Sequence, residues 1–574
     1  MKPASVIAGA LALTSAAAGC GSRAPSWTLP VEATSYPLNT GVAIVDEAAH
    51  RVLIVSANAD LSTSEQSVTV GHNVVTVATS PDGNHLFVMS NGDWPPQSPS
   101  DQPPSLTYID ATTTPVTVTP YPMKQPQPNL VLDPLGQYAA AYTGPGTPAQ
   151  FIDDPNEIVI FKLSPPATAP TSATLSIQSF GGTPQQLTFT PTLTLPDGTT
   201  TTGMQTRLLL VESTIDLTIL DMGHAFDPVP PQQITVQLTD GTTTQQETPA
   251  GVAVDDGDPS NPNDARIALW TSTDSNVFIF QLGPSEPGTP NPFTPSINSA
   301  SVGAIPSTVA FVHTSAQPAN DYGLQVLALV PSQTKAVFID EDDDTTEVTM
   351  PTPYTNLSVV TKIIDSPASG NGASPGGPDT ALLWAQSAST DDGVTGPIGM
   401  AFWDLGEVDG QISGVDVVSV SQPIQAVLDV GGPASVNPGL KIVQLATSGV
   451  YVLDLSSRMA SPLDTNGAPS LVSSADGTRL WAFAPNGTDL AEISLPIPPE
   501  GLSALSVVPL ITPMPIGGVY DVTIAGMPDG GVGKPHALIA THPQGTWGAT
   551  VFDAENPTTA NAQNVTALLL EASP

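Results

Sequence analysis

The stretch Thr79-Ser80-Pro81-Asp82-Gly83-Asn84-His85-Leu86-Phe87-Val88, followed by Tyr108-Ile109-Asp110, contains the pattern that decides the fold. A first short apolar strand ends near Ser80, and Asp82-Gly83 supplies the positive φ angles of a tight turn. A second strand begins at His85, and a third ends in an apolar pair and an aspartate. Short runs of branched and aromatic residues bounded by turn residues indicate β-strands.

The end of the third strand recurs along the chain as one column of residues. Successive members lie 40 to 64 residues apart, which is the period of a repeated four-stranded unit. A more polar fourth strand follows each member, as at Ile234 to Leu238. The column reads Asp110, Lys162, Asp221, Gln281, Asp340, Asp404, Asp454, Ser494 and Asp553.

We therefore predict an all-β protein, a β-propeller built from repeated four-stranded blades. The pattern gives nine complete units, and Gly41 to Val55 reads as the first hairpin of a partial one. Because propellers have about 4 to 8 blades, this count predicts either one large ring or two smaller rings in tandem. An array of β-sandwich modules is the alternative, but such modules need roughly twice the unit length.

The repeat resembles that of bacterial β-propellers with YVTN-type, lactonase-like repeats, and more loosely that of WD-repeat proteins. The first resemblance lies in Thr79 to Val88, and the second in Trp403-Asp404 and its equivalents. Both apply to about residues 40 to 555, and they imply a fold rather than one activity. Three of the nine column positions lack Asp, and no lactonase active-site residue aligns here, so no catalytic residue is assigned.

The first residues form a second signal. Met1-Lys2, an apolar or small-residue run from Ala4 to Ala18, and Cys20 resemble a bacterial lipoprotein signal, in which Cys20 is lipidated. Cys20 is also the sole cysteine of 574 residues. We expect residues 1–20 to be the signal peptide, 21–39 a Pro/Ser-rich tether, and 40–574 the propeller region. The alternative is an incidental cysteine beside an ordinary cleavage site.

This resemblance implies an extracytoplasmic protein, held in the bacterial cell envelope by its lipid. Gly21 and Ser22 follow the cysteine without an aspartate, which favours the outer membrane or cell surface over the inner membrane. The net charge of −40 repels nucleic acid and anionic headgroups. We therefore expect a membrane partner through the lipid and an envelope protein or glycan as ligand, and no nucleic acid.

Insertions replace the tight first turn in several units, at Asp255 to Asp264, Ser315 to Asp321, Ser366 to Asp379, Gly431 to Pro438 and Gly526 to Lys534. All turns of this type project from one face of a propeller, where long loops on a rigid ring present a binding surface. The first insertion carries the oxygen ligands that calcium prefers: Asp255, Asp256, Asp258, Asn261, Asn263 and Asp264. It lacks the EF-hand offsets, so a solvated acidic turn is favoured over a calcium site, and no cofactor is assigned with certainty.

The other motifs give no catalytic assignment. The six aspartates of the column, Asp110, Asp221, Asp340, Asp404, Asp454 and Asp553, are expected to be structural, because a strand-end aspartate caps the following turn. Gly372 to Gly376 matches a nucleophile elbow, but Pro375 prevents the required helix start. The seven histidines are too scattered for a zinc motif.

We conclude from the sequence that the protein is a binding or scaffold module using a loop-rich face, and more an interaction protein than an enzyme. One alternative is a lactonase-like hydrolase with a divalent metal in the central channel. Another is a structural envelope protein. Converging acidic and histidine side chains on the innermost strands would favour the enzyme. The expected innermost strands are instead apolar or small at Val74 to Ala78, Val252 to Val254, Val309 to Val312 and Val359 to Lys362.

Overall fold

A computed structural model describes the chain from residue 33 to residue 568. The gaps are 59, 148–151, 164–170, 196–203, 228–232, 239–246, 256–264, 283–294, 315–323, 341, 361–362, 365–373, 376–378, 386–398, 409–410, 413, 421–423, 431–438, 446–448, 456–458, 464–469, 475–476, 488, 496–505, 514–518, 527–535, 544–546, 555–560 and 567.

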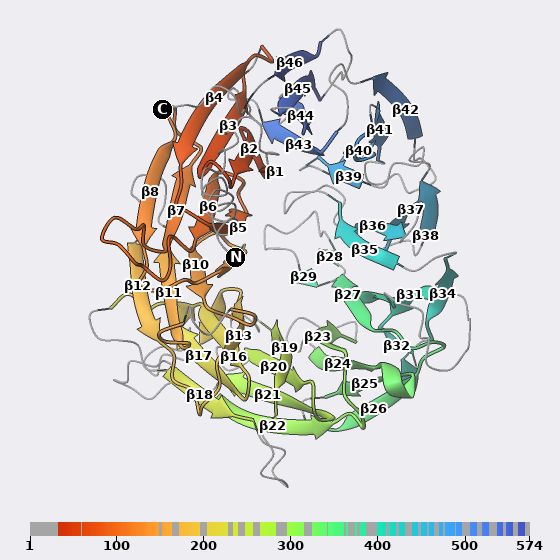
Figure 1. Ribbon diagram of the computed structural model, residues 1–574. Coiled ribbons are helices and arrows are strands. Elements are labelled where there is room, and N and C mark those ends of the chain that lie inside the picture. The colour runs from red at the N-terminus through yellow and green to blue at the C-terminus, as the bar shows by residue number, and fades with distance from the viewer. Residues whose placement is uncertain are drawn as a thin grey trace, which may run out of the picture.

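Ten four-stranded antiparallel sheets form one ring in the described part of the chain (Figure 1). Blade 1 has β1 (Ala33–Leu38), β2 (Gly41–Asp46), β3 (Arg51–Ala57) and β4 (Thr63–Thr69); blade 2 has β5 (Val74–Thr79), β6 (His85–Ser90), β7 (Ser105–Asp110) and β8 (Thr117–Pro122); blade 3 has β9 (Asn129–Leu132), β10 (Tyr138–Tyr142), β11 (Glu157–Lys162) and β12 (Thr171–Ser176). Blade 4 has β13 (Pro184–Phe189), β16 (Leu208–Ser213), β17 (Asp216–Asp221) and β18 (Gln233–Gln237); blade 5 has β19 (Pro249–Asp255), β20 (Arg266–Thr271), β21 (Asn276–Leu282) and β22 (Pro295–Ser301).

The second half of the ring repeats this order. Blade 6 has β23 (Thr308–His313), β24 (Leu324–Val330), β25 (Lys335–Ile339) and β26 (Thr345–Thr349); blade 7 has β27 (Asn356–Val360), β30 (Thr380–Trp384), β31 (Gly399–Asp404) and β34 (Asp416–Ser419). Blade 8 has β35 (Ile424–Asp429), β36 (Leu440–Leu445), β37 (Val450–Asp454) and β38 (Met459–Leu463); blade 9 has β39 (Ser470–Ser473), β40 (Arg479–Phe483), β41 (Asp489–Ser494) and β42 (Ser506–Pro513); blade 10 has β43 (Asp521–Gly526), β44 (His536–His542), β45 (Gly548–Asp553) and β46 (Gln563–Thr566).

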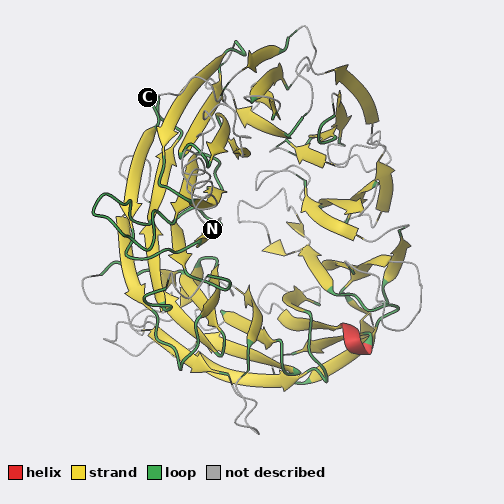
Figure 2. Ribbon diagram, in the orientation of Figure 1, coloured by secondary structure: helices red, strands yellow, loops and turns green. Residues whose placement is uncertain are grey.

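Three small hairpins of the described residues lie outside the blades. They are β14–β15 (Leu193–Leu195 and Met204–Thr206), β28–β29 (Ile363–Ile364 and Ser374–Pro375) and β32–β33 (Glu407–Val408 and Gln411–Ile412). A 3-10 turn at Pro331–Gln333 appears as the red element in Figure 2, and almost everything else described is strand or connection. In the described residues no helix is long and apolar enough to cross a membrane.

Neighbouring blades are joined by apolar side chains that alternate along each strand. Residues of one strand point to opposite neighbours because the side-chain period is two. Trp403 packs toward blade 6, where its ring meets Phe338 edge-on with centroids 5.3 Å apart, while the adjacent Phe402 packs toward blade 8. A sheet buried on both faces needs continuous apolar runs, which explains the apolar pairs before each column residue.

Ten apolar clusters, one at each border between neighbouring blades, close the ring. The closing cluster joins Val42, Ile44 and Val55 of blade 1 to Ile539 and Val551 of blade 10. Each of these two blades takes its strands from one continuous segment. Closure therefore depends on side-chain packing rather than on a strand exchanged between the ends of the chain.

The structure confirms the propeller and refines its details. There are ten blades, close to the nine complete units and one partial unit of the sequence, and they form one large ring, which was one of the two predicted arrangements. Gly41 to Val55 supplies the second and third strands of blade 1, not its first hairpin, and the innermost strand is Ala33–Leu38. The described blades therefore begin at Ala33, inside the segment 21–39 that was predicted to be a tether. Blade 1 was hard to recognise because its third strand ends in Val55-Ser56-Ala57, without an aspartate.

Candidate functional site

The ring has two faces, which we name by the connections they carry. The loop face carries the turns between first and second strands and between third and fourth strands. The crossover face carries the turns between second and third strands and the connections from one blade to the next. This assignment follows from antiparallel strand order.

All five predicted insertions connect a first strand to a second strand, so they belong to the loop face as expected. They join β19 to β20, β23 to β24, β27 to β30, β35 to β36, and β43 to β44. Most of their residues lie outside the described part of the chain. Within the insertion of blade 7, the β28–β29 hairpin extends toward the middle of the ring (Figure 1). Blade 4 has a further insertion with the β14–β15 hairpin, which the sequence analysis missed.

The innermost strands line the centre of the ring, and their charged residues stand only at strand ends. Asp255, His313 and Asp429 end β19, β23 and β35 at the loop face, whereas Asp521 begins β43 at the crossover face. The expected innermost segments at Val74, Val252, Val309 and Val359 are confirmed in β5, β19, β23 and β27. The described residues between the strand ends are apolar, small or uncharged polar, which does not supply a set of carboxylates inside the ring.

Each of the six column aspartates stands at the end of a third strand or directly after it. Four of them cap the following turn. Asp110 Oδ1 accepts from the Thr112 amide at 2.9 Å, Asp221 Oδ1 from the Gly223 amide at 2.9 Å, Asp340 Oδ1 from the Asp344 amide at 2.9 Å, and Asp404 Oδ1 from the Gly406 amide at 3.2 Å. In these four blades the carboxylate thus bonds a backbone amide of the turn that follows the third strand.

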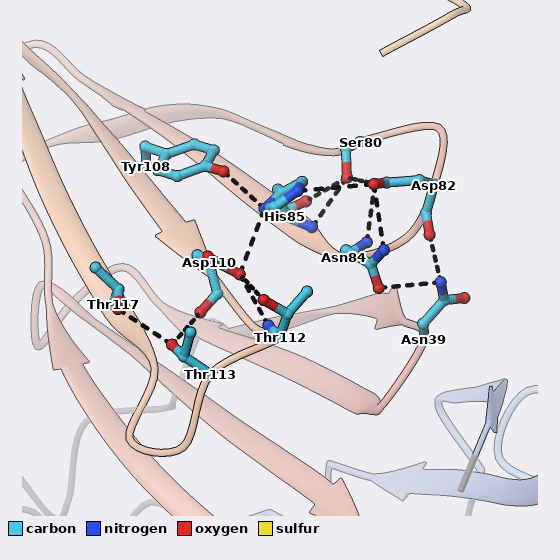
Figure 3. Close-up of polar contacts among 10 residues, drawn as sticks. All are labelled: Asn39, Ser80, Asp82, Asn84, His85, Tyr108, Asp110, Thr112, Thr113 and Thr117. Carbon is cyan, nitrogen blue, oxygen red and sulfur yellow. Dashed lines mark hydrogen bonds and ion pairs between the residues drawn. The ribbon is translucent and has the colours of Figure 1, made fainter. Parts of the chain in front are cut away.

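A polar network surrounds His85 at the loop-face end of blade 2 (Figure 3). Its Nδ1 lies 2.7 Å from the Tyr108 hydroxyl and 3.6 Å from Asp110, and its Nε2 lies 3.6 Å from Asp82. Burial, followed by the charges of Asp110 and Asp82, raises the pKa of Tyr108 above its usual value. The phenol therefore stays protonated and available to donate to His85.

Ser80 belongs to the same network but is not activated by the histidine. Its hydroxyl donates to Asp82 at 2.5 Å and accepts from the His85 amide at 2.9 Å, so it bonds the backbone of the turn rather than the imidazole. A nucleophilic serine needs a base within hydrogen-bond reach of its hydroxyl. The network therefore stabilises the turn, and Ser80 and His85 do not form a catalytic dyad.

Related turns occur in blades 3 and 9, which supports this structural interpretation. Ser474 accepts from the Arg479 amide at 3.0 Å, as Ser80 does from His85. Asp133 occupies the same place in blade 3, where it accepts from the Gln137 amide at 2.9 Å and is fully buried. Gly83, Gly136 and Gly477 adopt positive φ angles of 68°, 68° and 71° in these turns, which favour glycine.

Asp133 also forms a buried ion pair with Arg207 of blade 4, across the border between the two blades. Arg207 Nε donates in addition to the Thr190 carbonyl at 3.0 Å. Removing one partner of a buried pair leaves an uncompensated charge. This pair therefore fixes the β14–β15 insertion against blade 3, and the 74 residues between its partners hid it from sequence analysis.

On the crossover face, several blade connections bond the second-to-third turn of the next blade. His72 Nδ1 lies 3.0 Å from Asp93, Ser179 Oγ donates to Asp216 at 2.7 Å, and Gln125 Nε2 donates to the Asp154 carbonyl at 2.6 Å. The His72 ring also lies 4.3 Å from that of His50. These contacts hold the connections in place, so side chains on them are presented from an ordered backbone.

The candidate calcium loop remains a prediction. Asp255 ends β19 and lies 3.5 Å from Arg266 Nε, while Asp256, Asp258, Asn261, Asn263 and Asp264 lie outside the described residues. Among the side chains that the structure describes, no group of three or more His, Cys, Asp or Glu is arranged to hold a metal. Cys20 also lies outside the described part.

Glu212 of β16 is a buried carboxyl that no sequence pattern indicated. It is 2% exposed, and burial, opposed by a hydrogen bond from Thr188, raises its pKa to about 7. In the unfolded chain the group has its ordinary pKa near 4.5. The folded state therefore binds the proton more tightly, and its stability falls as the pH rises between these values.

Glu212→Gln should remove this pH dependence. We expect the variant to be more stable than the parent protein at pH 8, by on the order of 2–3 kcal/mol, and to lose that advantage below pH 4.5. Thermal and urea unfolding of the variant and the parent protein at both pH values measure this difference in stability. An equal difference at the two pH values would contradict a raised pKa of Glu212.

Neither protein-family models nor curated protein sequences gave a match to this chain. Among solved structures, a eukaryotic initiation factor is 11% identical, with coverage of 92% of this chain and 95% of that chain and a TM-score of 0.39. The WD40 domain of SCAP from fission yeast is 10% identical, with coverage of 71% and 89% and a TM-score of 0.37. The dihydro-heme d1 dehydrogenase NirN is 13% identical, with coverage of 76% and 77% and a TM-score of 0.35. The all-β propeller fold of this chain is shown by its own ten four-stranded sheets in the described residues.

Proposed function

We propose that this protein is a lipid-anchored, extracytoplasmic propeller of the bacterial cell envelope that acts as a binding or scaffold module through its loop face. The observation that carries the proposal is the placement of five insertions on that one face. Loops that extend from a rigid scaffold are the usual site of recognition. The anchor is Cys20, and the partner is an envelope protein or glycan in the outer membrane or at the cell surface.

The composition of the ring centre supports binding over the metal-dependent hydrolase. A catalytic divalent ion needs several carboxylate or imidazole ligands that converge. In the described innermost strands the three charged residues at the loop-face end, Asp255, His313 and Asp429, belong to three different blades. Asp255 and Asp429 are also engaged by Arg266 and Lys441, respectively.

Replacing loop-face insertions should abolish partner capture without unfolding the ring. The test variant carries Gly-Ser segments in place of residues 315–321 and 527–534, and the matched control carries one in place of Gln97 to Ser100, which is exposed on the crossover face. Purified envelope proteins and glycans are cross-linked to each variant and identified by mass spectrometry. We expect capture by the parent and control only. Equal capture by all three, at equal melting temperature, would contradict a loop-face site.

Cys20→Ser should release the protein from the membrane. A cell that incorporates a labelled fatty acid is expected to label the parent chain, and the variant should carry no label and appear in the soluble fraction. The reason is that the thiol is the attachment point of the lipid, and the chain has no second cysteine. Label on the variant, or membrane retention of an unlabelled parent, would contradict the anchor.

A further inference from the structure

The chain enters the ring at the crossover face. The innermost strand β1 begins at Ala33 and runs to a turn at Asn39, whose amide donates to the Gly83 carbonyl of the loop-face turn of blade 2 at 2.8 Å. The described chain therefore starts at the crossover face. If Cys20 carries lipid, as proposed above, the twelve residues 21–32 between it and this start span at most about 40 Å. A lipid at Cys20 would therefore hold this start of the ring within about 40 Å of the membrane.

Three exposed apolar side chains lie on this same face. Phe180, Ile305 and Tyr520 are 57%, 46% and 40% exposed, and each stands in a connection that leads into the innermost strand of the next blade. Exposed aromatic side chains are favoured where protein meets the headgroup region of a bilayer. Among the exposed large apolar residues of the described chain, Phe180 and Tyr520 are the aromatic ones, and both are on the crossover face.

Each of the three connections is tied to the ring. The Phe180 amide donates to Asp216 at 2.7 Å, and the Tyr520 ring packs edge-on against the buried Trp547 at 5.2 Å. Near Ile305, Gln333 donates to the Gly303 carbonyl at 3.0 Å. The backbone contacts fix the connections that carry Phe180 and Ile305, and the ring contact fixes Tyr520, so all three partly exposed side chains have defined positions on the face.

The three side chains are also spread around the ring. They precede blades 4, 6 and 10, so successive gaps are two, four and four blades. Three separated points define a plane, and contact at all of them would set the ring parallel to the surface that it touches. The net charge of −40 opposes contact with anionic lipid, so the surface that fits is a neutral one.

We infer that the crossover face lies against the surface of a neutral phospholipid leaflet, with Phe180, Ile305 and Tyr520 inserted among its headgroups. The loop face then points away from the membrane, toward the partners of the proposed binding site. This inference rests on the lipid anchor of the proposed function.

The test supplies the anchor chemically, so that it does not depend on lipidation in the cell. The chain from Cys20 onward, which keeps every described strand, is coupled through its sole thiol to a maleimide-bearing phospholipid in phosphatidylcholine vesicles. Hydrogen exchange is then compared between the coupled and free protein. We expect slower exchange in peptides that contain Phe180, Ile305 and Tyr520, and no change in the loop-face turns at Ser80 to Asn84 and Asp133 to Gln137.

Two matched variants distinguish insertion of these three side chains into the leaflet from mere closeness of the coupled protein to the vesicle. Phe180→Ser with Ile305→Ser and Tyr520→Ser should abolish the protection, whereas Leu135→Ser, at a loop-face residue 56% exposed, should leave it unchanged. Protection of the loop face, protection of neither face, or protection that survives the triple substitution would overturn the inference. If fatty-acid labelling of Cys20 fails while the coupled protein behaves as expected, the anchor is wrong and the membrane-binding face is right.

Discussion

The packing of each blade against its two neighbours is the interaction on which the whole structure depends. Every sheet buries apolar side chains on both faces. Truncating one large apolar side chain of a third strand therefore opens a cavity at a border between blades. Burial of a large aliphatic or aromatic side chain contributes about 1.5–3 kcal/mol. The border between blades 1 and 10 uses the same kind of packing as the other nine, so the ring closes without an exchanged strand.

The distribution of charge follows from this packing. Sheets buried on both sides leave little room for charged groups, and the chain accordingly has few basic residues for its length. Four of these basic residues stand at or next to the loop-face start of a second strand, and each forms an ion pair. The pairs are Arg207 with Asp133, Arg266 with Asp255, Lys441 with Asp429 and Arg479 with Glu492. The remaining negative charge opposes contact with polyanions.

The sequence was sufficient to predict the repeat, because an apolar pair followed by aspartate requires a doubly buried strand and a capped turn. Phe402, Trp403 and Asp404 show this correspondence most clearly. Blade 1 escaped recognition because Ser56, rather than an aspartate, stands at its column position, opposite the first residue of the second strand. The pairing of Asp133 with Arg207 and the burial of Glu212 could not be predicted, because both depend on which residues the closed ring brings together. The loop face was predicted from the insertions in the sequence. The exposed apolar residues of the crossover face were not predicted, because only the structure shows that the connections carrying them lie on one face.

One closed ring is the condition for both proposed surfaces, since two tandem rings would not place these connections on a common face. Ser35 Oγ of blade 1 donates to Asp521 Oδ2 of blade 10 at 3.3 Å, although 486 residues separate them. The most direct measurement is therefore oxidation of Ser35→Cys with Asp521→Cys in a Cys20→Ser background. A closed ring predicts an intramolecular disulfide, detected by mass spectrometry, in the monomer, and none when Ser35→Cys is combined with Asp274→Cys of blade 5. Free thiols or only cross-linked dimers with the first pair would contradict a single ten-bladed ring.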